Sequence, residues 1–119
     1  MLISRLAQLS GMSKDGIRHY EELGIIRSTR RQAGSRWYRD YDERELDMIE
    51  KARQAQQLGL SLKEIALLLK AMGDREVTHS ETIAFLQERL SVIRGRMDEL
   101  RRIEDFIVQK LERYQGSQG

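Results

Sequence analysis

The final third of the sequence carries an apolar repeat that constrains the fold more than any other feature. Between residue 79 and about residue 114 the chain has no helix breaker except Gly95, and the whole sequence lacks proline. Apolar residues recur there at alternating steps of three and four, the heptad pattern of a coiled coil. They fill nine of ten seam positions over five heptads, namely Ile83, Leu86, Leu90, Ile93, Met97, Leu100, Ile107, Leu111 and Tyr114.

A helix with such a seam needs a partner. At about 1.5 Å per residue it is roughly 54 Å long, and the small domain that precedes it cannot cover a seam of that length. The sequence therefore predicts a dimerisation helix over residues 79–115 that pairs with the same helix of a second copy. The alternative is a long helix that folds back on its own N-terminal domain.

The N-terminal region has the pattern of short helices punctuated by glycine. Residues 4–9 predict a first helix, Gly11 a turn, and Ser13 the N-cap of a second helix that runs through Glu22 and ends at Gly24. Its inward residues are predicted to be Ile17, Tyr20 and Leu23. Helix, tight turn and helix within about twenty residues is typical of a helix-turn-helix.

The helical period disappears between residues 25 and 41. Gly34 and Ser35 predict a turn, and Trp37, Tyr38 and Tyr41 have strand propensity. We therefore expect a β-hairpin, or wing, with its tip near residues 32–35.

Three further helices are expected to begin at capping boxes, formed by Asp42 with Glu45, Ser61 with Glu64, and Thr78 with Glu81. The inner face of the second of these helices is predicted to consist of Ile65, Leu68, Leu69 and Met72. The expected fold is mainly α, a winged helix-turn-helix with a small β-hairpin wing followed by a long dimerisation helix. Its parts are a winged helix-turn-helix head over residues 1–73, a connector over 74–78, a coiled-coil helix over 79–115 and a disordered tail over 116–119.

Charge is distributed unevenly along the chain. Residues 1–39 carry eight Arg or Lys against three Asp or Glu, a net charge of +5, whereas residues 40–119 carry thirteen against sixteen, a net charge of −3. Five arginines and no acid lie between residues 27 and 39. A localised basic patch of this kind favours a polyanion-binding site over its alternative, a solvated loop.

The second helix adds residues that suit nucleic acid. Lys14 and Arg18 are four residues apart and therefore share a helix face. An arginine can bind two acceptors on a guanine edge, while Lys and Ser side chains suit phosphates. Basic elements before and after this helix could clamp a DNA groove and its flanking phosphates.

Other chemistries lack the residues that they need. The sequence has no cysteine, so disulfides, thiolate metal sites and thiol nucleophiles are excluded. His79 is interpreted as a surface residue at a helix start, and the adjacent Glu21 and Glu22 cannot face each other on a helix. Neither a signal peptide nor the roughly 20-residue apolar run of a membrane helix is present. We expect a cytoplasmic protein that is not an enzyme and uses no cofactor or metal.

Three separated motifs carry a family resemblance. The stretch IRHYEELGII, the wing ending in YRDYDERELDMI, and QLGLSLKEIALLL follow one another over residues 2–72. In that order and spacing they resemble the N-terminal part of MerR-family transcription regulators. The long terminal helix is similar to the antiparallel dimerisation helix of that family.

The resemblance implies a homodimer that binds double-stranded DNA at an inverted-repeat operator. It also implies a promoter with an over-long spacer, which the protein bends and untwists so that RNA polymerase can use it. By the family pattern Arg18, His19 and Tyr20 fall in the reading helix, with His19 where the family usually has Tyr, and Tyr38 and Arg39 fall in the wing. The predicted DNA-binding residues are Ser13, Lys14, Arg18, His19, Tyr20, Arg30, Arg31, Arg36, Tyr38 and Arg39.

Two alternatives remain open at this point. A coiled-coil adaptor whose basic head binds protein would share the seam but leave the arginine-rich wing unexplained. A small organic effector could occupy an apolar cavity between the helix at residues 65–72 and the partner's long helix, with Trp37, Phe85 and Phe106 as candidate aromatics. A constitutive DNA-shaping protein without an inducer is the competing hypothesis. The sequence names neither the operator nor the regulated genes, and it does not separate activation from repression.

Overall fold

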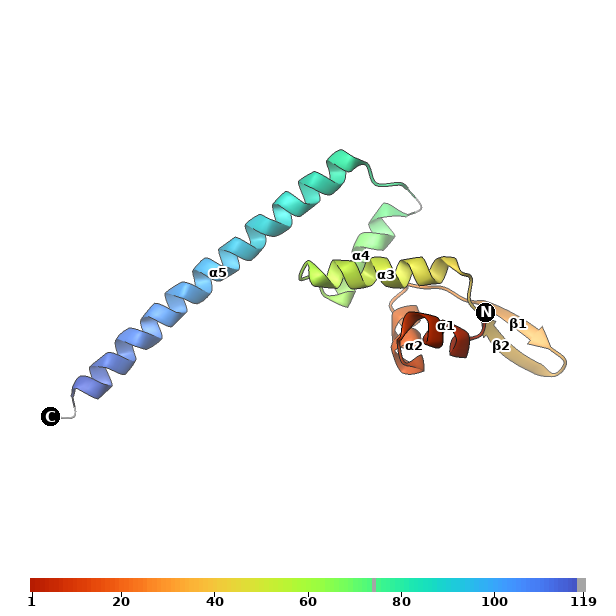
Figure 1. Ribbon diagram of the computed structural model, residues 1–119, viewed down its shortest axis with the longest axis horizontal. Coiled ribbons are helices and arrows are strands. Elements are labelled where there is room, and N and C mark those ends of the chain that lie inside the picture. Colours follow the sequence, from red (N-terminus) through yellow and green to blue (C-terminus); the bar gives the residue numbers. More distant parts are fainter. Residues whose placement is uncertain (74, 118–119) are drawn as a thin grey trace. The chain divides into compact units, whose positions relative to one another are not determined.

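The computed structural model describes residues 1–73 and 75–117, which form two units (Figure 1). The N-terminal unit ends at Arg75 and the second unit begins at Glu76. The first unit holds, in order, α1 (Ile3–Ser10), α2 (Lys14–Glu22), β1 (Thr29–Ala33), β2 (Arg36–Asp40), α3 (Arg44–Gln57) and α4 (Leu62–Met72). The second unit holds α5 (His79–Gly116). The predicted fold class, mainly α with one hairpin and a long terminal helix, is confirmed.

Local sequence signals define both ends of α2. The Ser13 hydroxyl accepts a hydrogen bond from the Gly16 amide at 3.0 Å, as expected of an N-cap. At the other end Gly24 has a φ of +82°. The Gly24 and Ile25 amides donate to the carbonyls of Glu21 and Tyr20, both at 3.0 Å. These two bonds form a Schellman motif, which turns the chain toward the wing.

The wing is a two-stranded antiparallel hairpin. Thr29 pairs with Asp40, Arg30 with Arg39 and Arg31 with Tyr38, and the register continues to the pair of Ala33 and Arg36. Gly34 and Ser35 connect the strands, and Gly34 has a φ of +64°, which glycine adopts without steric cost. The predicted hairpin and its tip are therefore confirmed.

The predicted capping box at the start of α3 is wrong. The residue at the N-cap position is Glu43, and its side chain makes no capping hydrogen bond. Asp42 instead accepts from the Arg44 amide at 3.2 Å. The Glu45 carboxylate accepts a hydrogen bond from the backbone of Arg27. A tertiary contact between Glu45 and the segment before the wing has therefore replaced the predicted local hydrogen bond of the capping box.

The other two capping boxes are confirmed, at Ser61 with Glu64 and at Thr78 with Glu81. The predicted inner face of α4 needs a correction. Ile65 is buried and Leu69 packs against the core, but Leu68 and Met72 do not belong to it. Leu62 and Ala66 pack against the core in their place, whereas Leu67 on the outer face of α4 is 69% exposed.

A single core joins the elements of the N-terminal unit. Its buried members come from α1, α2, the chain after α2, the end of the hairpin, α3 and α4; they are Leu6, Ile17, Tyr20, Ile25, Ile26, Tyr41, Ile49, Ala52 and Ile65. Tyr41 is 1% exposed and follows β2 directly. The core therefore anchors the base of the wing as well as α2.

The helix α5 has no buried residue among those described. Eight of its nine apolar seam residues are open to solvent in the single chain, from Leu86 at 42% exposed to Tyr114 at 68%, and Ile93 is partly exposed. The helix ends one residue beyond the predicted boundary of 115. Residue 74 of the predicted connector and residues 118–119 of the predicted tail lie outside the described residues. Over the described ranges, none of the helices is long and apolar enough to cross a membrane.

Candidate nucleic-acid interface

The outer face of α2 presents three side chains that could contact DNA. Lys14, Arg18 and His19 are all exposed. Arg18 forms an ion pair with Asp15 at 2.9 Å while its side chain stays 56% exposed. His19 lies 3.9 Å from Glu22. These are weak surface contacts, so a phosphate or base edge can replace them at modest cost.

Tyr20 lies on the opposite face of α2. It is 6% exposed and belongs to the core. Its hydroxyl donates to the Gln56 side-chain oxygen of α3 at 3.4 Å. Tyr20 was predicted to bind DNA, but the structure places its side chain in the core between α2 and α3.

The register of the hairpin divides the predicted wing residues between two faces. Paired residues share a face, and residues two apart along a strand share it as well. Arg30 and Arg39 therefore lie on one face together with Trp37, whose ring is 4.7 Å from the Arg30 guanidinium. Arg31, Tyr38 and Arg36 lie on the other face.

On that second face Arg31 is tied to the base of the wing. Its Nε atom lies 2.6 Å from Asp40, which also binds the amino group of Met1 at 2.6 Å. Hydrogen bonds from these two cations hold the pKa of Asp40 below its usual value. Arg36 sits beside the turn and has no ion-pair partner within the described part of the chain.

Glu21 of α2 connects the first face of the wing to the helix. Its Oε1 atom accepts from the Tyr41 hydroxyl at 2.6 Å, and its Oε2 atom accepts from the Ser28 hydroxyl at 2.6 Å. Arg39 donates to the same Oε2 atom through Nη1. One carboxylate thus binds the chain just before β1, the end of β2 and the residue after it.

This network shifts two pKa values in opposite directions. Burial raises the pKa of Glu21, but hydrogen bonds from Ser28 and Tyr41 and the charge of Arg39 outweigh it, so the net pKa is lowered. Burial and the neighbouring Glu21 carboxylate raise the pKa of Tyr41 to about 12. The charges of Arg39 and Arg18 act on the pKa of Tyr41 in the opposite sense.

The role of Glu21 was not predicted from the sequence, in which it stood out only as one of two adjacent acidic residues. A signal was present, because Glu21 is four residues after the inward Ile17 and so lies toward the inner side of α2. Its partners could not be read from the sequence, since they lie 7 to 20 residues away along the chain.

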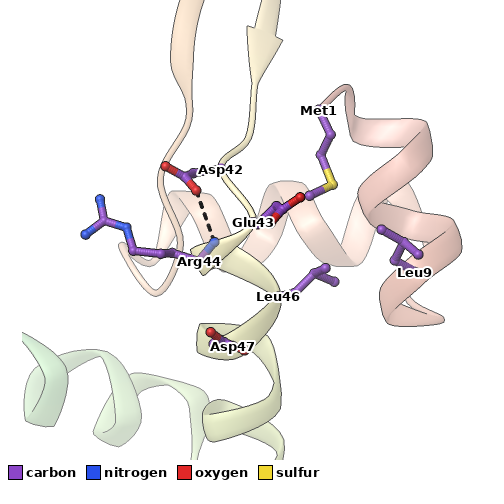
Figure 2. A pocket seen from close by; sticks show the side chains of 7 residues that line it. All are labelled: Met1, Leu9, Asp42, Glu43, Arg44, Leu46 and Asp47. Atoms are coloured by element: carbon purple, nitrogen blue, oxygen red, sulfur yellow. Dashed lines mark hydrogen bonds between the residues drawn. The ribbon is translucent and has the colours of Figure 1, made fainter.

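One depression on the N-terminal unit has the wrong charge for DNA. It encloses about 450 Å³ between α1 and the start of α3 (Figure 2). Asp42, Glu43 and Asp47 line it beside Met1, Leu9, Arg44 and Leu46. Carboxylates repel phosphates, so the candidate interface is the exposed basic surface of α2 and the wing. Among the described residues no three acidic or histidine side chains gather as metal ligands would.

Comparison with known proteins identifies the family. The family model of MerR HTH family regulatory proteins matches residues 1–72, and a second model, described as MerR, DNA binding, matches residues 44–109. The chain belongs to the MerR family of helix-turn-helix regulators. The resemblance predicted from the three motifs is therefore confirmed, and the match reaches from α1 well into α5.

Several relatives are similar over most of their length. The mercuric resistance operon regulatory protein of Bacillus cereus is 31% identical over 93% of this chain and 83% of that protein. The lead(II) complex of the regulator PbrR691 from Ralstonia metallidurans is 26% identical with a TM-score of 0.72, over 92% of this chain and 84% of that chain. HiNmlR, a MerR regulator that lacks the sensor domain and was solved on promoter DNA, is 22% identical with a TM-score of 0.53, over 98% and 90%.

These comparisons establish the general function. The protein is a DNA-binding transcription regulator of the MerR family, and this family is not one of enzymes.

Proposed function

We propose that this regulator binds an inverted-repeat operator as a homodimer and reads it with α2 and the wing. The observation that carries the proposal is the contact of Glu21 with Arg39, which fixes the wing beside α2. The residues proposed to contact DNA are Ser13, Lys14, Arg18 and His19 in α2 and Arg30, Arg31, Arg36, Tyr38 and Arg39 in the wing, with Tyr20 supporting α2 from the core.

The contacts can be divided by chemistry. Ser13 and Lys14 lie at the N-terminus of α2, where backbone amides favour a phosphate. Arg18 can leave Asp15 and bind a guanine edge through two hydrogen bonds. The wing arginines supply positive charge for phosphates beside the groove, which fixes the position of the protein on the duplex.

The homodimer is proposed from α5. An exposed apolar seam over five heptads is buried when a second copy pairs with it in antiparallel orientation, as in the family. Two heads related by a two-fold axis require an operator with the same symmetry. The coiled-coil helix over residues 79–115 and the DNA-binding head over residues 1–73 remain proposed domain boundaries.

The regulatory mechanism rests on family membership. We infer that the bound dimer bends and untwists a promoter whose spacer is over-long, so that RNA polymerase can use it. A protein that binds promoter DNA works in the compartment that holds the chromosome, so a cytoplasmic location is part of the proposal. An energy-transfer pair on the two ends of the bound duplex would measure the bend. An unchanged end-to-end distance on binding would contradict this part.

The nature of any inducer follows from composition. Two relatives carry mercury or lead in their names, but these 119 residues hold no cysteine to supply the thiolates that such soft metals select. We propose that any effector is a small organic molecule. Equilibrium dialysis against thiophilic metals should show no stoichiometric, tight binding, whereas such binding would overturn this part. A thermal-shift screen of hydrophobic compounds would search for the effector, and a flat screen would favour constitutive action.

Selection of bound sequences from a pool of random duplexes tests the function directly. The expected result is enrichment of one motif with two half-sites related by two-fold symmetry. Binding should weaken steeply with added salt, because phosphate contacts release counterions. Failure to enrich any sequence, or binding that does not respond to salt, would favour an adaptor that binds protein.

A further inference from the structure

Glu21 is placed to do more than stabilise the fold. Its side chain extends from α2 to both ends of the hairpin and is 16% exposed. The Arg39 side chain bound to it is 65% exposed. An inner carboxylate therefore holds an outer guanidinium at the edge of the proposed DNA surface.

The geometry leaves Arg39 oriented but still able to bind. Its Nη1 atom contacts the Glu21 carboxylate and, at 3.4 Å, the Ser28 hydroxyl. The guanidinium also has Nε and Nη2 donors, for which the described contacts show no acceptor. Those donors can meet a phosphate without breaking the contact with Glu21.

We propose that Glu21 is a positioning residue for DNA specificity. It holds Arg39, and with it the wing, at a fixed position relative to α2, so that the wing meets its phosphates only when α2 is in register with its bases. This inference rests on the proposed DNA-binding function and names a determinant of its specificity.

Glu21 has two physical effects on DNA binding. Its negative charge near the phosphate-binding surface reduces affinity for any duplex, whatever its sequence. Its hold on Arg39 reduces the side-chain entropy lost when the operator binds, which favours the matched complex. Only the second effect raises the ratio of operator affinity to affinity for unrelated DNA, because the first lowers both affinities alike.

The adjacent Glu22 provides a matched control. It belongs to the same helix and carries the same charge, but its side chain is 77% exposed and lies 3.9 Å from His19. Replacing Glu22 with Gln removes the same charge from nearly the same place without releasing Arg39.

The test compares Glu21→Gln with Glu22→Gln on two duplexes. One is the duplex that the wild-type protein enriches from a random pool, and the other is a scrambled duplex of the same length and composition. Glu21→Gln should bind the scrambled duplex more tightly and the enriched duplex more weakly, so that the affinity ratio falls about tenfold. Glu22→Gln should leave the ratio within about twofold of wild type.

A double-mutant cycle separates positioning from general loss of structure. In an Arg39→Ala background, Glu21→Gln should change the affinity ratio no further. Arg39→Lys keeps the charge but loses the planar donor set, so the ratio of its affinities for the enriched and scrambled duplexes should fall as well. Arg39→Lys leaves Glu21 in place and tests the inference even if Glu21→Gln does not fold.

The outcomes also separate this inference from the proposed function. A wild-type protein that enriches no sequence would overturn the proposed function and this inference with it. A wild-type protein that enriches a sequence, with Glu21→Gln and Arg39→Lys both retaining the wild-type ratio, would overturn the inference alone.

Discussion

The Tyr41 hydroxyl donates a hydrogen bond to the Glu21 carboxylate over 2.6 Å, although the two residues are 20 positions apart in the chain. Tyr41 is 1% exposed and its pKa is raised to about 12, so the hydroxyl keeps its proton at neutral pH. The bond ties the end of the wing to α2 at the point where Arg39 also reaches Glu21.

Tyr41→Phe should destabilise the N-terminal unit by about 1.5–3 kcal/mol, the range for a hydrogen bond to a charged group. The loss arises because the partly buried Glu21 carboxylate keeps its charge but loses a donor. Urea unfolding followed by circular dichroism measures it. Tyr38→Phe on the exposed face of β2 is the matched control and should change the free energy of unfolding by less than about 0.5 kcal/mol. Equal effects of the two changes would contradict this account.

The lowered pKa of Glu21 predicts a specific dependence of stability on pH. A carboxyl group whose pKa is depressed by folding stabilises the protein above its unfolded pKa, near 4.5, and loses that contribution as the pH falls through the lower folded value. The difference in unfolding free energy between wild type and Glu21→Gln should therefore be largest at neutral pH. It should narrow as the solution is acidified below about pH 4.5.

Asp40 also has a lowered pKa, so the acid unfolding of the wild type alone would not isolate the contribution of Glu21. The difference in unfolding free energy between wild type and Glu21→Gln does isolate it, because Asp40 is present in both proteins. A difference that stays constant from neutral pH to about pH 3 would contradict the prediction.

Placing aspartate at both Leu90 and Ile93 should convert the dimer to a monomer. Both residues lie on the proposed seam, where paired helices would bury the new charges without a partner. Ala84→Asp with Ser91→Asp is the matched control, because both positions are exposed in α5 and lie beside the seam. Sedimentation should give a monomer for the first variant and a dimer for the second. A dimer mass for the seam variant would show that the chains associate elsewhere.

Glu104 is the one seam position without an apolar side chain, and we expect it to oppose parallel pairing. In a parallel dimer it would face Glu104 of the partner subunit. In an antiparallel pair that overlaps the whole seam, with residue 83 opposite residue 114, it would lie opposite the partner's Ile93. A polar seam residue of this kind fixes orientation at a cost in stability. Glu104→Leu should therefore raise the melting temperature of the dimer.

The absence of native cysteine makes the orientation measurable. In the antiparallel register that overlaps the whole seam, residue 86 lies opposite residue 111, so Leu86→Cys combined with Leu111→Cys should form an intermolecular disulfide on oxidation. Leu86→Cys alone should not, because two copies of this residue meet only in a parallel pair. A disulfide in the single variant would contradict antiparallel pairing.

The elements with local causes could be predicted from the sequence. Ser61 with Glu64 and Thr78 with Glu81 cap their helices because both partners lie within one turn. The Asp42 and Glu45 box failed because a more distant group, the Arg27 backbone, competes for the Glu45 carboxylate. Spacing along the chain does not report such competition.

The basic residues of the candidate site could be predicted from the sequence, but their arrangement in space could not. The basic residues of α2 and the wing were identified from charge and motif. Their division between two faces depends on strand register, which sets Arg30 with Arg39 and Arg31 with Tyr38. Tyr20 illustrates the remaining difficulty, because its position in the reading helix suggested DNA while its helical phase pointed to the core.

The central claim is that α2 and the wing bind duplex DNA. Fluorescence anisotropy on the enriched duplex, repeated at several salt concentrations, tests it most directly. Arg18→Ala should weaken binding by about 1–3 kcal/mol if it reads a base edge, and Arg39→Ala should flatten the salt dependence by removing a phosphate contact. Lys51→Ala, which removes an exposed charge from α3, should match the wild type. If Arg18→Ala and Arg39→Ala both bind like Lys51→Ala, the DNA surface lies elsewhere on the protein.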